Sequence, residues 1–260
     1  MTTARIARAY VVTGAGSGIG RATALRLFAA GAGVVLNDVD ADGLAETSRQ
    51  IPEDHRVELA ADASDEGSVK RMFDECERAF GRLDGVHANA GIVGSMESLL
   101  SLGVDDFERV LRVNLVGAFL AIRFGAERMH NGGSIVVTSS VAGLRAGAGP
   151  APYSASKAAL ISLVQNAAFQ LSGTGVRVNA VCPGLVETNM TRPIFELARK
   201  HGKEDRIGQL NPLQRAAAPS EIAEVVHFLL SEQSSYINGT AVVADGGLSA
   251  AHPFVPGRLW

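Results

Sequence analysis

Short, continuous runs of apolar residues alternate with longer stretches of helical periodicity along the whole chain. The apolar runs predict strands at residues 9–13, 33–38, 56–60, 84–88, 134–139, 176–181 and 240–243. The stretches between them predict helices at residues 18–30, 41–50, 65–80, 104–128, 152–172 and 219–231. Continuous rather than alternating apolar runs are typical of a parallel sheet that is covered on both faces. The pattern therefore predicts a doubly wound, Rossmann-type α/β fold, with a parallel sheet of about seven strands and helices on both faces.

A polar residue or a turn follows the end of most predicted strands. These positions are Thr13, Asp38, Asp62, Asn89, Ser140 and Pro183. Because the carboxyl ends of parallel strands lie at one edge of a sheet, and ligands bind at that edge, we expect these residues to converge on one cleft.

The first predicted strand runs into a glycine-rich turn, within the segment AYVVTGAGSGIG at residues 9–20. Gly14, Gly18 and Gly20 have the spacing G-x-x-x-G-x-G, which differs from the common dinucleotide fingerprint. The physical demand is the same, because a tight turn must expose backbone N–H groups to a pyrophosphate at the start of a helix. The turn predicts a dinucleotide site. An ordinary strand-to-helix turn that is rich in glycine is the alternative.

Asp38 follows the second predicted strand, 18 residues beyond Gly20. This offset is close to that of the acidic residue that binds the adenosine ribose in dinucleotide sites. A carboxylate accepts hydrogen bonds from the ribose hydroxyls and would repel a 2′-phosphate. Val39 follows it, and Ser17 is the variable residue of the turn, so no basic residue stands beside it in sequence. These residues favour NAD over NADP, unless Asp38 only caps the next helix.

Tyr153 and Lys157 are four residues apart in a predicted helix, so their side chains share one face. A neighbouring ammonium group favours the phenolate and lowers the pKa of a tyrosine. Ser140, at the end of a predicted strand, can hold a substrate oxygen while Tyr153 exchanges its proton. This chemistry suits the interconversion of an alcohol and a carbonyl. The alternative is a helix N-terminus with a surface lysine.

These motifs occur in the order and spacing of a known family. They are TGAGSGIG at 13–20, ANAG at 88–91, Asn114, Ser140, YSASK at 153–157 and PGLVET at 183–188. From Arg8 to about Gly247, the chain resembles the short-chain dehydrogenase/reductase family in its short, single-domain, NAD-preferring form. The resemblance implies an oxidoreductase that acts on CH–OH groups with a nicotinamide cofactor, here NAD.

The resemblance also implies the roles of the catalytic residues, Ser140, Tyr153, Lys157 and Asn114. Tyr153 would be the acid/base, and Lys157 would lower its pKa and bind the nicotinamide ribose. Ser140 would position the substrate oxygen. Asn114 would support a water-linked proton path to Lys157.

A larger set of residues is implied to bind the cofactor. Its members are Gly14, Ser17, Gly18, Ile19, Gly20, Asp38, Asp62, Ala63, Asn89, Ala90, Gly91, Tyr153, Lys157, Pro183, Gly184, Val186 and Thr188. Asp62 and Ala63 would meet the adenine. The backbone of Val186 and the hydroxyl of Thr188 would hold the nicotinamide carboxamide.

Two positions depart from the family pattern. The usual NNAG reads ANAG here, so Ala88 replaces the first Asn, while Asn89 is kept and would brace the glycine-rich turn through Thr13. Gln214 stands where the family often has Gly. The catalytic set is complete, which argues against a non-catalytic member.

Composition narrows the class further. The 260 residues are 47% hydrophobic with a net charge of −3, which fits one α/β domain over residues 1–260. No basic run indicates nucleic acid, and the apolar stretch near the N-terminus is too short for a membrane span or a signal peptide. Two cysteines, Cys76 and Cys182, imply no disulfide framework. We expect a cytoplasmic protein without a metal site.

Residues 187–213 are too long for an ordinary connection. We expect a lid over the cleft, with a solvated excursion as the alternative. The predicted substrate pocket combines this lid with the loop after Ser140. Its members are Leu144, Met190, Ile194 and Phe195. Their character suggests room for a bulky apolar or cyclic substrate.

Helices 104–128 and 152–172 are apolar on more than one face, which predicts a second partner beyond their own sheet. The family usually forms tetramers through these helices, so we expect a homotetramer. The C-terminal segment 252–260 carries Phe254 and Trp260. We expect it to lie against a neighbouring subunit, near that subunit's cleft, with a frayed end as the alternative.

The favoured function is therefore NAD(H)-dependent interconversion of a secondary alcohol and a ketone by hydride transfer. An NADPH-dependent 3-oxoacyl-thioester reductase is an alternative on the same scaffold, and Asp38 argues against it. A non-catalytic NAD-binding sensor or scaffold is the alternative of another class.

Overall fold

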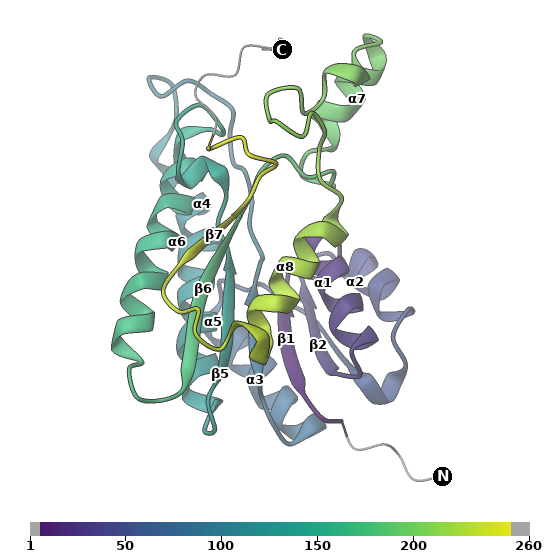
Figure 1. The fold of residues 1–260 in the computed structure, drawn as a ribbon, viewed down its shortest axis with the longest axis vertical. Coiled ribbons are helices and arrows are strands. Elements are labelled where there is room, and N and C mark those ends of the chain that lie inside the picture. Colours follow the sequence, from purple (N-terminus) through teal and green to yellow (C-terminus); the bar gives the residue numbers. More distant parts are fainter. Residues whose placement is uncertain (1–5, 251–260) are drawn as a thin grey trace.

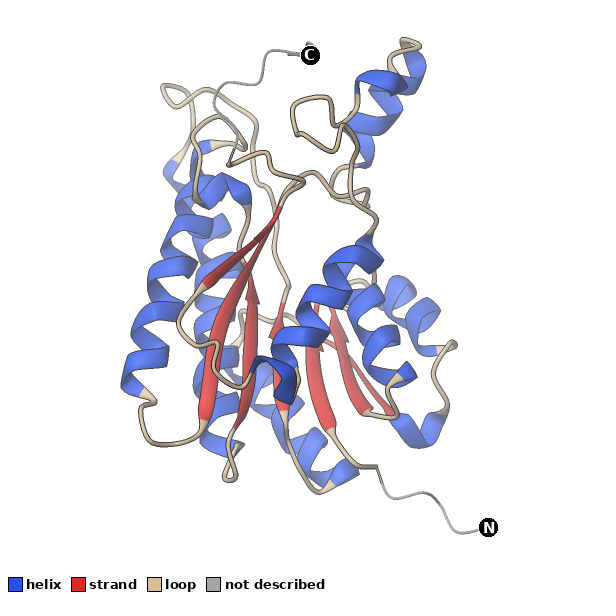
Figure 2. Cartoon of the chain, in the orientation of Figure 1, coloured by secondary structure: helices blue, strands red, loops and turns tan. Residues whose placement is uncertain are grey.

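A computed structural model describes residues 6–250, which form a seven-stranded parallel sheet flanked by helices (Figures 1 and 2). The strands are β1 (Ala9–Thr13), β2 (Gly33–Asp38), β3 (Arg56–Ala60), β4 (Gly85–Ala88), β5 (Gly133–Thr138), β6 (Val176–Pro183) and β7 (Ala241–Ala244). Their order in the sheet is β3-β2-β1-β4-β5-β6-β7. The direction of the strand order therefore changes between β1 and β4, where doubly wound sheets bind ligands. The predicted fold class is confirmed.

Helices cover both faces of this sheet. They are α1 (Gly18–Ala29), α2 (Ala41–Ser48), α3 (Glu66–Phe80), α5 (Gly117–Arg128), α6 (Ala151–Gln170) and α8 (Pro219–Leu230). Within residues 6–250, two further helices do not pack on the sheet: α4 (Val104–Leu111) lies against α6, and α7 (Arg192–Lys200) stands away from the sheet (Figure 1). One apolar layer packs α3, α5 and α6 on the sheet, and the other packs α1, α2 and α8 on the opposite face. Successive strand residues alternate between the layers, so Val11 contributes to the first and Val12 to the second, both fully buried. Burial of each such side chain stabilises the fold by about 1.5–3 kcal/mol.

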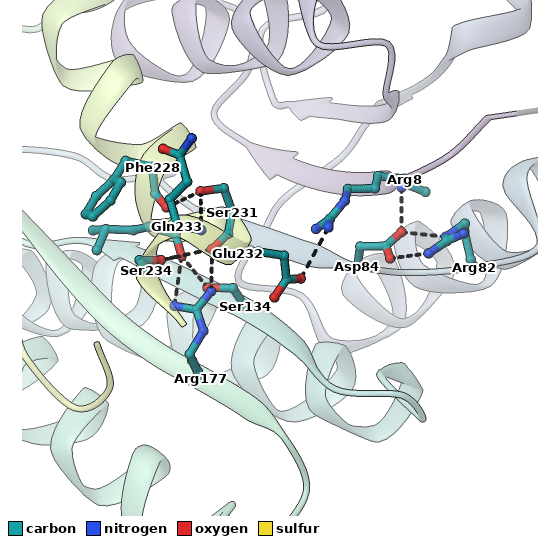
Figure 3. Close-up of polar contacts among 12 residues, drawn as sticks. Arg8, Arg82, Asp84, Ser134, Arg177, Phe228, Ser231, Glu232, Gln233 and Ser234 are labelled. Carbon is teal, nitrogen blue, oxygen red and sulfur yellow. Dashed lines mark hydrogen bonds and ion pairs between the residues drawn. The ribbon is translucent and has the colours of Figure 1, made fainter. Parts of the chain in front are cut away.

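Paired charges fasten the amino-terminal edge of the sheet, opposite the predicted cleft (Figure 3). The Asp84 carboxylate accepts a hydrogen bond from the Ala9 backbone N–H at 2.8 Å and one from Arg82 Nε at 2.7 Å. Arg8 pairs with Glu232 at 3.2 Å. A hollow of about 600 Å³ lies here. The guanidinium groups of Arg8 and Arg82, which line this hollow, are already paired with carboxylates. We therefore interpret the surrounding ion pairs as structural, and the hollow as no ligand site.

The chain from 104 to 128 is interrupted, although its periodicity predicts one helix. α4 ends at Leu111, a π-helical turn spans Arg112–Val116, and α5 begins at Gly117. Asn114 lies in this turn, and its side chain bonds to the backbone of Ile92. A single π-helical turn inside a helix often marks a functional site, because it redirects one side chain.

The two ends of the predicted insertion, at residues 186–187 and 217, are hydrogen-bonded to each other and form what we call the neck of the insertion. Val186 pairs with Ala217, and the Glu187 N–H donates to the Ala217 carbonyl at 3.0 Å. Between these ends the chain forms α7 and further turns (Figure 1). A role as a lid stays a prediction. Segment 252–260, with the predicted tail contacts of Phe254 and Trp260, lies outside the described residues.

No helix within residues 6–250 is both long enough and apolar enough to cross a membrane.

Candidate active site

The glycine-rich turn between β1 and α1 needs its glycines. Gly18 has φ +51°, and a Cβ there would lie 3.0 Å from Cγ2 of Thr188. A Cβ on Gly20 would lie 2.0 Å from the Gly14 carbonyl oxygen, which leaves no space for any side chain. Ser17 is the N-cap residue of α1, and among the described residues its side chain makes no capping bond. The N–H groups of this first turn suit an anionic phosphate.

Asp38 ends β2 and faces this turn. One of its oxygens accepts a hydrogen bond from the Gly16 N–H at 2.8 Å, and the other accepts one from the Asp40 N–H at 3.0 Å. The side chain that caps α2 belongs to Asp40, which accepts from the Gly43 N–H at 3.2 Å. The reading of Asp38 as a mere helix cap is therefore wrong.

The nearest guanidinium group of the turn is already engaged. Arg21 pairs with Glu46 at 2.6 Å and donates to the Thr47 hydroxyl at 2.9 Å. It also bonds to the Gly16 carbonyl. Arg21 thus fixes the shape of the turn, and its charge is partly neutralised by Glu46.

Asn89 braces the turn from β4, in the way that the resemblance implies. Its side-chain Nδ2 donates to the carbonyl oxygens of Thr13 at 3.2 Å and Gly14 at 3.3 Å. The Thr13 hydroxyl accepts from the backbone N–H groups of Asn89 at 3.0 Å and Ala90 at 3.1 Å. Ala88, which stands in place of the first Asn of the family pattern, is a buried core residue, and the bonds of Asn89 are present beside it.

Asp62 and Ala63 follow β3 at the same edge. Asp62 Oδ1 accepts from the Ser64 N–H at 2.7 Å and the Ser64 hydroxyl at 2.8 Å. Ala63 is only 6% exposed and packs in the core. Asp62 is therefore the member of this pair that keeps a polar side chain at the site.

Lys157 is buried, with 3% of its surface exposed, so the reading of a surface lysine is wrong. Its Nζ donates to the Thr138 carbonyl at 2.7 Å and lies 5.4 Å from the centre of the Tyr153 ring. Burial lowers the pKa of Lys157 from its ordinary value to about 8. The ammonium group is therefore poised to titrate near neutral pH.

The pKa of Tyr153 moves against the expectation. Burial raises it above the ordinary tyrosine value, and a hydrogen bond with Ser140 lowers it by less. Lys157 does not lower it in this structure because the ammonium lies beside the ring and donates to a carbonyl instead of the phenol oxygen. Ser140 is also buried, and its hydroxyl accepts from the Ala142 N–H at 3.1 Å.

Asn114 lies close to Lys157 without bonding to it directly. Its amide bonds to both backbone groups of Ile92, at 2.8 and 2.9 Å, and to the Ser156 hydroxyl at 3.0 Å. A Cβ on Gly91 would lie 3.1 Å from Asn114 Oδ1 and 3.5 Å from Lys157 Nζ. The absence of a side chain at Gly91 thus keeps the space between the two open.

The segment after β6 closes the site from the other side. Pro183 ends β6, and Gly184 packs against Asp245. The Val186 carbonyl accepts from the Thr191 hydroxyl at 2.6 Å, and the Thr188 N–H donates to that hydroxyl at 3.0 Å. Because Thr188 also contacts Gly18, the insertion begins directly against the glycine-rich turn.

The residues predicted to line a substrate pocket divide into two kinds. Leu144, Met190 and Ile194 are 41%, 45% and 53% exposed, which leaves apolar surface for a ligand. Phe195 is only 5% exposed. It therefore anchors α7 and offers little surface to a substrate.

Two residues of the site were not predicted from the sequence. Thr138, at the end of β5, supplies the carbonyl that holds Lys157. His87 lies inside β4 and contacts the Thr138 hydroxyl. A polar residue within an otherwise apolar strand was the available signal.

The sheet and the glycine-rich turn have the arrangement of a dinucleotide-binding fold, and the buried Tyr153–Lys157 pair belongs to the same chain segment that follows β5. A family model described as enoyl-(acyl carrier protein) reductase matches residues 14–249. Levodione reductase of Leifsonia aquatica is 38% identical over 256 residues, covering 94% of this chain and 95% of that protein. A crystal structure of levodione reductase, 36% identical in sequence, superposes with a TM-score of 0.89, and the match covers 96% of this chain and all of that one.

Two further relatives are similar over comparable lengths. Meso-2,3-butanediol dehydrogenase of Serratia marcescens is 37% identical and covers 94% of this chain and 95% of that protein. 3beta-hydroxysteroid dehydrogenase 2 of Eggerthella lenta is 35% identical and covers 92% and 94%. The chain belongs to the short-chain dehydrogenase/reductase family. Members of this family are oxidoreductases that use a nicotinamide cofactor.

Proposed function

We propose that this protein is an NAD(H)-dependent oxidoreductase that interconverts a secondary alcohol and a ketone. The observation that carries the proposal is the meeting of Lys157, Tyr153 and Ser140 at the sheet edge that also holds the glycine-rich turn. Bound nicotinamide supplies or accepts the hydride. Tyr153 takes the alcohol proton during oxidation and returns it during reduction, while the Ser140 hydroxyl orients the substrate oxygen.

The charge of Lys157 supports this proton transfer. Burial disfavours the phenolate of Tyr153. The Lys157 ammonium, 5.4 Å from the ring centre, would offset that penalty on turning from the Thr138 carbonyl toward the phenol oxygen. Since the pKa of Lys157 is about 8, its support weakens as the pH rises beyond that value.

NAD is the proposed cofactor because Asp38 occupies the position facing the turn. Its carboxylate is fixed by the Gly16 N–H, so it cannot swing aside easily to admit a 2′-phosphate. Arg21, the basic residue nearby, is already bonded to Glu46 and Thr47.

A bulky apolar or cyclic alcohol is the proposed substrate class. Exposed apolar side chains at Leu144, Met190 and Ile194 support it. The names of the relatives, which include a hydroxysteroid dehydrogenase, are in keeping with this choice.

A second candidate is an NADPH-dependent 3-oxoacyl-thioester reductase. It is favoured by the description of the matching family model, which concerns an acyl-carrier-protein-linked reductase. Asp38 disfavours it. A non-catalytic role is disfavoured by the complete set of Ser140, Tyr153 and Lys157.

The test is a panel of secondary alcohols and 3-hydroxyacyl thioesters, each with NAD and with NADP, followed by the near-ultraviolet absorbance of the reduced nicotinamide. Turnover of ring or branched alcohols with NAD supports the proposal. Turnover confined to the thioesters with NADP establishes the second candidate, and nucleotide binding without any turnover establishes a sensor or scaffold.

A further inference from the structure

His87 is a fully buried histidine in the middle of the sheet. It lies in β4, paired in register with Val12 of β1 and Val136 of β5, both of which belong to the apolar layer under α1 and α8. Its Nε2 lies 2.9 Å from the Thr138 hydroxyl. Burial lowers the pKa of His87 to about 3, so the ring is neutral near pH 7.

The direction of each hydrogen bond from this ring outward can be deduced. Asn89 Nδ2 donates to the carbonyls of Thr13 and Gly14, so Asn89 Oδ1 must face Thr138. The Thr138 hydroxyl, which has a single proton, therefore donates its hydrogen bond to Asn89 Oδ1, at 3.1 Å. It can only accept from His87, which fixes the His87 tautomer with the proton on Nε2. Nδ1 of His87 has no hydrogen-bond partner among residues 6–250.

Thr138 is thereby held at two points that both serve the site. Its hydroxyl connects His87 to Asn89, and Asn89 holds the glycine-rich turn. Its carbonyl accepts from Lys157 Nζ at 2.7 Å. One buried donor thus fixes the orientation of an amide that shapes the phosphate-binding turn.

We propose that His87 is a positioning residue for the nicotinamide cofactor, acting through Thr138 and Asn89 on the glycine-rich turn. The proposal rests on the proposed function to the extent that a dinucleotide must bind this turn. Without the His87 donor, the Thr138 hydroxyl is free to rotate away from Asn89. The Asn89 amide then loses one of its three anchors, and the turn loses its fixed shape.

The binding test compares three single variants and one double variant by calorimetric titration with NAD. His87→Leu removes the donor and should raise the Kd by about tenfold. His87→Gln keeps an N–H donor at a similar reach and should stay within about threefold of the wild type. Thr138→Val removes the bridge, so adding His87→Leu to it should produce no further weakening.

Val136→Ala is the matched control, because it creates a cavity beside His87 without touching the hydrogen bonds. The proposal is overturned if Val136→Ala, at an equal loss of Tm, weakens NAD binding as much as His87→Leu does. It is equally overturned if His87→Leu binds NAD like the wild type, or if its effect simply adds to that of Thr138→Val.

A second readout needs neither cofactor nor activity. The nitrogen chemical shifts of the His87 ring in the nucleotide-free protein should report the neutral Nε2–H tautomer, and Thr138→Val should change them. An Nδ1–H tautomer would refute the deduced chain of donors. If the wild type bound neither NAD nor NADP, the proposed function would fail, while this measurement would still decide the arrangement around His87.

Discussion

At the end of β2, Asp38 is held by the backbone of the turn that it faces. Replacing it by serine should raise the Kd for NAD about tenfold and narrow the gap to NADP, because a fixed negative charge no longer opposes the 2′-phosphate. Titration of both nucleotides measures this change. Asp40→Ser is the control: serine also caps helices, so α2 and the preference should persist. A wild type that binds NADP more tightly than NAD would overturn this role for Asp38.

We expect replacement of Lys157 by an apolar residue to raise the stability of the protein while abolishing its activity. Burial depresses the pKa of its ammonium group to about 8, so the folded state bears the cost of a buried charge below that pH. The cost declines as the pH rises from about 8 toward the ordinary lysine value, because the folded protein then loses the proton before the unfolded chain does.

Lys157→Met should therefore abolish activity and stabilise the nucleotide-free protein by on the order of 1 kcal/mol at neutral pH. The gain should shrink as the pH rises above about 8. Chemical unfolding over a series of pH values measures it. The exposed Lys200 provides a control in Lys200→Met, which should show no such pH-dependent gain. A variant that loses stability at neutral pH would contradict this account of Lys157.

At the scale of elements, the strands were predictable and the interruption of 104–128 was not. β1, β2 and β3 have the predicted bounds. In β1 and β2 this follows from burial on both faces, which requires a continuous apolar core. Within the π-helical turn, Asn114 bonds to the backbone of Ile92, which lies 22 residues earlier in the chain. Local periodicity carries no information about such a partner.

The candidate site divides in the same way. The glycine-rich turn and the Tyr153–Lys157 pair could be predicted from the sequence because each depends on residues that are close together in the chain. The raised pKa of Tyr153 and the bonds of His87 could not, because they depend on burial and on neighbours in other strands. The sequence indicates which side chains can lie close together. Their exposure to solvent, and with it their pKa, depends on how the helices pack on the sheet.

The insertion contains a strained residue shortly before residue 217 of its neck. Gln214 has φ +55° and is the one non-glycine residue with positive φ within residues 6–250. Since this conformation costs an ordinary residue about 1–2 kcal/mol and glycine costs about 0.5–1 kcal/mol in unfolded-state entropy, Gln214→Gly should stabilise the protein by roughly 0.5–1 kcal/mol.

Thermal unfolding measures this effect, with Gln214→Ala as the control. Alanine removes the same side-chain atoms but keeps the strain, so it should leave Tm nearly unchanged. Equal behaviour of the two variants would show that the side chain, and not the backbone conformation, decides the stability at this position.

At the scale of the whole molecule, we propose a homotetramer of 27.1 kDa chains built on α4, α5 and α6. Phe119 on α5 and Phe169 on α6 are 44% and 81% exposed in the single chain. Large exposed aromatic groups on adjoining helices favour a protein partner. Light scattering should return about four times the chain mass, and Phe119→Glu should lower it.

Tyr236, which is fully exposed beyond α8, gives the matched control in Tyr236→Glu. A monomer at micromolar concentration would contradict the proposed assembly. Equal dissociation by both variants would remove α5 from the proposed interface.

The central claim is that the Tyr153 hydroxyl transfers the proton and that NAD binding does not depend on this hydroxyl. Tyr153→Phe keeps the ring and removes only the hydroxyl, so the decisive measurement is its turnover of an alcohol substrate alongside its calorimetric affinity for NAD. The account predicts that turnover falls by at least about a hundredfold while the Kd for NAD stays within about threefold. Turnover close to that of the wild type, in protein that is folded and binds NAD, would contradict it.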